Sequence, residues 1–498
     1  MNLNALAHSW RSPGLSRRVT LWALLVLAGT CVQDLPIRAH ALPQDEDRGN
    51  ILTIDHQVPH KSTVPANAGE SVNLFVRERF ADNKTPGKAV LMVHGRSVPA
   101  LAGFDLQYKR YGWAMELAKA GFDVFVADLQ GNGRSPISEH GTRDFAPMQD
   151  PCNVSNFSPD FQQGRLLISN PLSAECPPSY PFRLVPSNSE WDELDTVVEY
   201  IRNLPQRMEL PEAEKKVALV SWSRGSLVAG PYAVQHPEKV DSLFLLAPIF
   251  NPIAVPGIPY PDGFAPPVKP RADGTVAAAC TRDEVIATPP LCPGVKPGVK
   301  LQLAATAANP TMTLTPRNDV VDAQGNTIIV GLMDRWNRPV NSEIQCEDQI
   351  EDGIQDVVWN AVMDNDELGR TWGPPPPGAP EGSAPEGVMR VRSFFPWGWT
   401  PSAAYRVSVP ALIIFGEFDT EGTKEGFRVA DNSPLLYDTI PHDHKLLFKV
   451  ACAGHYMPWE RQSKVLHHIS KEWLKHGAVE GFTNGKFFID REGNLFLQ

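Results

Sequence analysis

This sequence of 498 residues lacks the features of several protein classes, and each absence narrows the range of functions that it can have. The net charge is −11 and no basic stripe is present, so we expect no nucleic-acid partner. The seven cysteines include no CxxC pair, and no paired histidines accompany them, so no metal site is predicted. The stretch "QGNGRS" lacks the lysine and the full glycine spacing of a phosphate-binding loop. We therefore predict no cofactor and no metal.

The N-terminal region also lacks an apolar run long enough for a membrane span. Residues 16–30 ("SRRVTLWALLVLAGT") have a basic flank and about ten apolar residues, too few to cross a bilayer. Residues 39–41 (Ala-His-Ala) form a small-x-small cleavage site. The pattern predicts a signal peptide over residues 1–41, of the twin-arginine or the general secretory type. We expect a secreted or periplasmic protein with no stable membrane span after signal removal; an uncleaved anchor is the alternative.

Removal of residues 1–41 takes away Cys31 and leaves an even number of cysteines, which in an exported protein predicts disulfides. The six that remain are Cys152, Cys176, Cys280, Cys292, Cys346 and Cys452. Proximity along the chain favours the first with the second and the third with the fourth, which leaves Cys346 for Cys452. Six cysteines allow fifteen pairings, so the sequence alone leaves the connectivity open.

Continuous apolar runs alternate with amphipathic helical patterns over much of the chain. "KAVLMVHG" (88–95), "VALVSW" (217–222), "VDSLFLL" (240–246) and "ALIIFG" (411–416) are typical of buried parallel strands, and two alternating segments near residues 51–80 predict an antiparallel pair. Residues 189–205 and 458–477 predict helices, the second of them a surface helix that carries His467 and His468. This alternation predicts an α/β fold with a mostly parallel sheet covered by helices on both faces.

Two segments interrupt the alternation and hold most of the proline-rich stretches. Insertions of this size within a regular sheet are usually lids or caps. We predict a core formed by residues 42–250, with a loop insertion at about 136–188, and by residues 405–478. Residues 251–404 form the predicted cap, with an acidic helix within 341–368, and residues 479–498 a C-terminal hairpin.

One strand-to-helix junction carries the motif of a catalytic nucleophile. Ser221, Ser223 and Gly225 have the small-x-nucleophile-x-small spacing of a nucleophile elbow, directly after a buried strand. The sharp turn leaves no room for large side chains two positions either side of the central serine. We therefore expect the Ser223 hydroxyl above the sheet edge.

A serine nucleophile needs a base and an orienting carboxylate, and the late strands supply both. Asp419 follows the strand "ALIIFGEFD", with Glu417 as the competing acid, and His455 follows the next strand. The order serine, acid, histidine is the one such folds use. The oxyanion donors are expected to be the backbone N–H groups of Arg224 and Arg96, with Ser97 as the next candidate after Arg96.

Five motifs in this order give a resemblance to a known family. "VHG" (93–95), "DLQGNGRS" (128–135), "SWSRG" (221–225), "GEFD" (416–419) and "GHYMPWE" (454–460) resemble those of α/β-hydrolases of the lipase/esterase-like superfamily. The resemblance covers about residues 50–250 and 405–478. It implies Ser223 as nucleophile, Asp419 as acid and His455 as base, and it gives Asp128 and Ser135 a turn-stabilising role beside the site. His94 is expected to support its loop.

These residues predict a serine hydrolase that cleaves carboxylic esters of small molecules. An aromatic-rich run before residue 405 favours an apolar or aromatic substrate group, although these side chains fit the interior of the cap equally well. We expect Trp222, Trp397 and Trp399 to contact the substrate. Amide or peptide cleavage, acyl transfer, and a binding protein without catalysis are the alternatives; an aspartate nucleophile is excluded because serine occupies the elbow.

Overall fold

The computed structural model describes residues 50–64, 68–82, 86–135, 187–250, 268–269, 278–279, 312–321, 324–325, 327–329, 331–336, 346–367, 369–373, 375–376, 378–380, 383–392, 399–419 and 429–498. The predicted signal peptide and residues 136–186 of the loop insertion predicted at about 136–188 lie outside these ranges, as do Trp397 and the cysteines at 152, 176, 280 and 292. Residues 187 and 188 belong to a helix.

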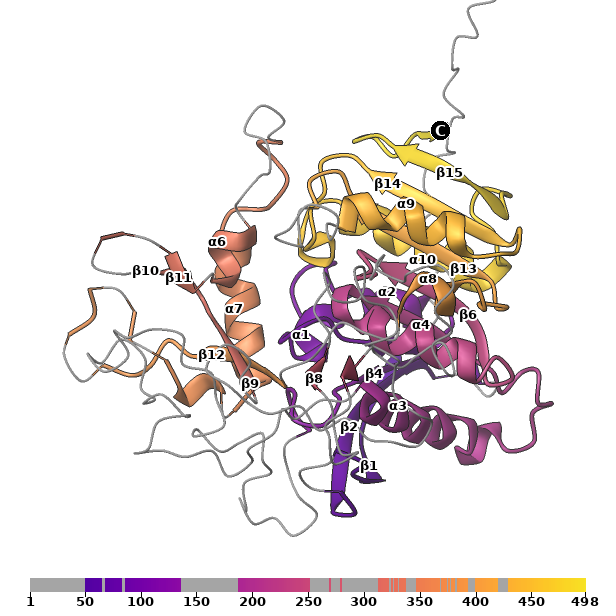
Figure 1. Ribbon diagram of the computed structural model, residues 1–498, viewed down its shortest axis with the longest axis horizontal. Helices are drawn as coiled ribbons and strands as arrows, with labels where there is room; N and C mark the ends of the chain where they lie inside the picture. The colour runs from indigo at the N-terminus through magenta and orange to yellow at the C-terminus, as the bar shows by residue number, and fades with distance from the viewer. Residues whose placement is uncertain are drawn as a thin grey trace, which may run out of the picture. The chain divides into compact units, whose positions relative to one another are not determined.

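A ten-stranded sheet forms the frame of the protein (Figure 1). Its strand order is β1-β2-β4-β3-β5-β6-β13-β14-β15-β16. The strands are β1 (Ile51–Lys61), β2 (Ser71–Ala81), β3 (Ala89–Val93), β4 (Asp123–Ala127), β5 (Val217–Trp222), β6 (Val240–Leu246), β13 (Ala411–Gly416), β14 (Lys445–Val450), β15 (Asn484–Ile489) and β16 (Leu495–Leu497). All pairs from β4 to β15 are parallel, and β1, β2 and β16 pair antiparallel at the two edges. The predicted mostly parallel sheet is confirmed.

The central strands are buried along their whole length, which explains their continuous apolar sequences. The helices of the core are α1 (Ala100–Phe104), α2 (Trp113–Lys119), α3 (Ser187–Arg202), α4 (Ser226–Gln235), α8 (Pro401–Ala404), α9 (Val429–Thr439) and α10 (Ser463–His476). The Trp113 indole on α2 donates to Ser470 on α10, and the Trp191 indole on α3 donates to the Leu227 carbonyl on α4. These pairs of helices cover the sheet.

His467 lies on α10, which has an exposed face as predicted, but its side chain is on the buried face of the helix. This side chain is buried on α10 with its ring stacked on Trp113, and burial lowers the pKa of His467 to about 4. The C-terminal hairpin, formed by β15 and β16, extends the central sheet through parallel pairing of β15 with β14.

A large insertion separates two strands that are neighbours in the sheet, because β6 ends at Leu246 and β13 begins at Ala411. Its described elements are β7 (Val268–Lys269), β8 (Ala278–Ala279), β9 (Met312–Pro316), β10 (Val320–Val321), β11 (Thr327–Ile329), α6 (Leu332–Trp336), α7 (Ile354–Asp364) and β12 (Val388–Arg392). Strands β9 and β12 pair antiparallel. The acidic helix α7 is shorter than predicted, because Gly353 adopts a left-handed conformation (φ 76°) and the helix begins after it.

Residues 346–352 of the insertion are fastened to the core at several points. A disulfide joins Cys346 to Cys452. This is the pair that remains when the other four cysteines are paired by proximity along the chain. The Arg461 N–H donates to the Gln349 carbonyl (2.9 Å), and Lys109 and Arg491 form ion pairs with Glu351 and Asp348. Within the described residues, no helix has both the length and the apolar character needed to span a membrane.

Candidate active site

Ser223 occupies a strained backbone position at the end of β5. Its φ is 55°, in the left-handed region that is unfavourable for a side chain with a Cβ atom. The short helical turn 223–225 and then α4 follow directly. A Cβ atom on Gly225 would lie 2.5 Å from the Val93 carbonyl oxygen, so only glycine fits there. The local geometry is that of a nucleophile elbow, as the spacing predicts.

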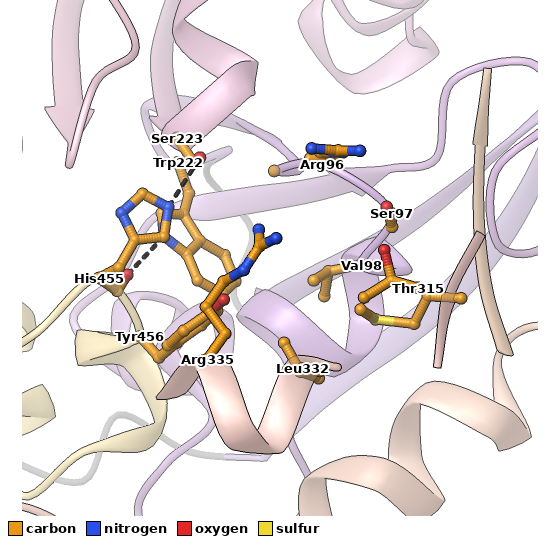
Figure 2. A pocket seen from close by; sticks show the side chains of 12 residues that line it. Arg96, Ser97, Val98, Trp222, Ser223, Thr315, Leu332, Arg335, His455 and Tyr456 are labelled. Carbon is orange, nitrogen blue, oxygen red and sulfur yellow. Dashed lines mark hydrogen bonds between the residues drawn. The ribbon is translucent and has the colours of Figure 1, made fainter. Parts of the chain in front are cut away.

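The structure brings Ser223, His455 and Asp419 together from three strand ends. His455 Nε2 lies 2.8 Å from Ser223 Oγ, and its Nδ1 lies 3.0 Å from both carboxylate oxygens of Asp419 (Figure 2 shows the serine and the imidazole). The three side chains are at least nine-tenths buried. Glu417, the competing acid, turns elsewhere, and its Oε2 accepts from the Cys452 N–H (3.3 Å).

Buried polar contacts fix the loop that carries His455. The Trp222 indole N–H donates to the His455 carbonyl (2.9 Å). The fully buried Glu460 accepts from the Gly454 N–H (2.7 Å) and from the Trp336 indole of α6 (3.1 Å). Burial raises the pKa of Glu460 to about 7. Glu460 therefore connects the histidine loop to the insertion, a role that no sequence motif indicated.

The loop after β3 approaches Ser223 from the other side. Gly95, Arg96 and Ser97 line the same cavity as Ser223, and Ser97 has a left-handed backbone (φ 62°). This placement is the one expected for an oxyanion loop. The Arg224 side chain is buried and forms an ion pair with Glu190 of α3, a partner that sequence reasoning missed.

The turn of residues 128–135 supports this loop rather than the reaction centre. The buried Asp128 accepts from the N–H groups of Ala100 (2.7 Å) and Arg134 (2.9 Å), and Ser135 Oγ donates to the Asp128 carbonyl (2.6 Å). Burial raises the pKa of Asp128 to about 7. His94 Nε2 lies 2.9 Å from the Asn132 amide nitrogen, so this histidine ties the loop to the turn.

A cavity opens in front of Ser223 between the core and the insertion (Figure 2). Its described lining residues from the core are Gly95, Arg96, Ser97, Val98, Trp222, Ser223, His455 and Tyr456, and those from the insertion are Thr315, Leu332, Arg335 and Met389. No motif or periodicity in the sequence marks the four residues from the insertion as cavity-lining. Tyr456 is adjacent to His455 in sequence, and that neighbourhood could have indicated it.

The tryptophans predicted to contact substrate have different positions. Trp222 lines the cavity, with its ring also packed on Trp459. Trp399 is not among the lining residues: it is fully buried against Phe250 and fills the space beside Gly230 of α4. Its environment is that of a packed interior side chain. Trp397 lies outside the described residues.

The comparisons with known proteins agree with this architecture. A family profile described as the alpha/beta hydrolase fold matches residues 88–286. That segment contains the elbow and its flanking strands, and the sheet order continues the same fold to the C-terminus. The chain therefore has the α/β-hydrolase fold. A search among curated proteins found no match.

Solved structures of several hydrolases resemble the chain at low identity. A thermophilic esterase from Thermogutta terrifontis is 14% identical, covers 85% of this chain and 99% of its own, and has a TM-score of 0.40. A meta-cleavage product hydrolase from Pseudomonas fluorescens (13%, 83% and 97%, 0.38) and a haloalkane dehalogenase from Bradyrhizobium elkani (11%, 86% and 99%, 0.38) are also similar. Similarity at this level concerns the fold and does not indicate a substrate.

Proposed function

We propose that this protein is a serine hydrolase that cleaves carboxylic esters of small molecules through an acyl-enzyme on Ser223. One observation carries the proposal: an unbroken chain of contacts runs from the Ser223 hydroxyl through the His455 imidazole (2.8 Å) to the Asp419 carboxylate (3.0 Å). These are the distances at which a base can take the proton of a nucleophile while a carboxylate holds the base in position.

In the proposed reaction, Ser223 Oγ attacks the ester carbonyl and His455 Nε2 takes the hydroxyl proton. Asp419 accepts from Nδ1–H and stabilises the imidazolium that forms. The backbone N–H groups of Arg224 and Arg96 donate to the negative oxygen of the tetrahedral intermediate. His455 then returns the proton to the leaving alcohol. A water molecule, deprotonated by the same imidazole, releases the acid and restores the serine.

The test combines covalent labelling with turnover of neutral chromogenic esters of different acyl length. We expect a fluorophosphonate to label the wild-type protein and not Ser223→Ala. We also expect Ser223→Ala to lose ester turnover by a factor on the order of 10⁶, since removal of the nucleophile disables the whole triad. Glu417→Gln, which alters a carboxylate outside the triad, is the control for folding. Turnover retained by Ser223→Ala would refute the assignment.

We further propose that the protein is exported to an oxidising compartment. The basic-apolar pattern of residues 16–30 and the Cys346–Cys452 disulfide support this proposal. Cell fractionation of the full-length protein tests it, with the same chain lacking residues 1–41 as the control. Recovery of both forms from the cytoplasm would contradict export.

A further inference from the structure

Two arginines line the cavity in front of the nucleophile. Arg96 comes from the loop after β3, and Arg335 comes from α6 of the insertion. Figure 2 shows the Arg335 side chain directed into the space between Ser223 and Arg96. The described lining residues include no aspartate or glutamate. Two positive charges in the wall of one cavity favour a negatively charged ligand.

A hydroxyl in the same wall provides an independent sign of a polar ligand. Ser97 is buried and lines the cavity, and its Oγ has no hydrogen-bond partner within the described part of the chain. Buried hydroxyls without a partner are uncommon, so a ligand oxygen that reaches Ser97 would satisfy this group. Thr315 of β9 lines the cavity as well and brings a second hydroxyl from the insertion.

The remaining wall is apolar. Val98, Trp222, Leu332 and Met389 present hydrocarbon and aromatic surface to the cavity. A ligand that matches this wall therefore has an apolar body and one localised negative charge. A carboxylate fits better than a phosphate dianion, because moving a single charge beside apolar groups costs less desolvation free energy.

We propose that the substrate is an ester whose apolar body carries a carboxylate, and that Arg335 and Arg96 hold this carboxylate while Ser97 donates its hydroxyl to it. The inference rests on the proposed esterase function, because it names the substrate class of the same site. A planar guanidinium has five N–H donors and binds a carboxylate through two of them, so each arginine can hold the ligand alongside other contacts.

The test uses pairs of esters that differ only in charge. 4-Nitrophenyl valerate and mono-4-nitrophenyl glutarate have acyl chains of the same length, ending in a methyl group and a carboxylate respectively. 4-Methylphenyl acetate and 4-acetoxybenzoate place the same difference on the alcohol side. Rates with Ser223→Ala give the uncatalysed background. We expect the wild-type kcat/KM to favour the carboxylate member of at least one pair by about tenfold or more.

Arg335→Gln is expected to lower that charge preference by about tenfold or more, because hydrogen bonds to charged groups are the stronger class. Arg335→Lys keeps the charge but not the planar arrangement of donors, so its charge preference should lie between those of the wild type and Arg335→Gln. Arg317→Gln is the matched control: Arg317 precedes α6 in the same insertion, pairs with Glu386 and Asp356, and is not among the described cavity-lining residues. Its charge preference should equal that of the wild type.

The outcomes separate this inference from the proposed function. Fluorophosphonate labelling of Ser223 and turnover of neutral esters, without a carboxylate preference in either pair, would overturn the inference and leave the hydrolase intact. A loss in Arg335→Gln that is equal for both members of each pair would also overturn it, since that result indicates a structural arginine. Absence of labelling and of all ester turnover in the wild type would instead refute the hydrolase itself.

Discussion

The core and the insertion contribute to one cavity in different ways. The core supplies Ser223, Asp419 and His455, each directly after a strand of a sheet that is buried and hydrogen-bonded on both sides. The insertion supplies Thr315, Leu332, Arg335 and Met389 from short elements outside that sheet. The side chains of the proposed triad thus have positions fixed by the sheet, whereas the other four lining residues are positioned by elements outside it.

The largest effect is expected for a substitution in the core. Asp419→Asn should lower kcat for a neutral ester by about 10⁴-fold, because the amide favours the wrong imidazole tautomer. Glu417→Gln should stay within about tenfold of the wild type, since Glu417 contacts the Cys452 N–H and not the imidazole. Steady-state kinetics on the two variants measures both losses, with far-UV circular dichroism and thermal unfolding as the check on folding. Equal losses in the two variants would contradict the assignment of the acid.

A smaller effect is expected where the insertion joins the core. The disulfide closes a loop with a sequence separation of 106 residues. Replacing both Cys346 and Cys452 by serine should lower the free energy of unfolding by about 2–5 kcal/mol, because the unfolded chain regains conformational entropy. Urea denaturation of the oxidised wild type and of the double variant gives the difference. Identical midpoints and slopes of the two urea denaturation curves would mean that this bond adds no stability. Wild type treated with reductant is the control.

The smallest expected effect concerns pH and the contact between Glu460 and Trp336. Burial raises the pKa of Glu460 from 4.5 to about 7, so the folded state holds this proton more tightly than the unfolded state. Its stabilising contribution is complete below about pH 4.5 and is lost as pH rises through about 7, a change on the order of 3 kcal/mol. Glu460 therefore contributes a fall in the free energy of unfolding over this interval, whereas His467, whose pKa is lowered to about 4, contributes a rise.

Glu460→Gln should remove the contribution of Glu460 and leave those of the other groups, among them Asp128, whose raised pKa acts in the same direction as that of Glu460. Chemical denaturation at several pH values between 4.5 and 7.5 measures the slope. Glu492→Gln, which removes an exposed carboxylate, is the control and should leave the slope unchanged. If the free energy of unfolding fell more steeply with pH in Glu460→Gln than in the wild type, the burial argument would be contradicted.

The sequence indicated the sheet and the three side chains that the structure brings together, because both follow from local rules. Buried parallel strands are continuous apolar runs, and the groups that follow them lie at one edge of the sheet. Ser223 could be recognised because the residues two positions either side of it, Ser221 and Gly225, must be small, a restriction visible within five residues. Asp419 and His455 then followed from their places after two later strands.

The positions that could not be predicted depend on contacts between distant segments. Trp399 lies within an aromatic-rich run, yet its burial depends on the space beside Gly230, far away in sequence. His467 is buried because Trp113 of another helix stacks on it. Arg335 stands in a short helix of the insertion, where no periodicity shows which side chains face the core. In each case the partner is supplied by tertiary packing alone.

The covalent bond between positions 346 and 452 has a consequence for how molecules enter and leave. It holds the two Cα atoms 5.6 Å apart, and one of them is three residues before His455. A displacement of the insertion at position 346 must therefore carry the histidine loop with it, because the bond couples the two backbones. Chemical reduction would uncouple them, so the redox state of the surroundings determines how firmly this part of the insertion is held to the loop of His455.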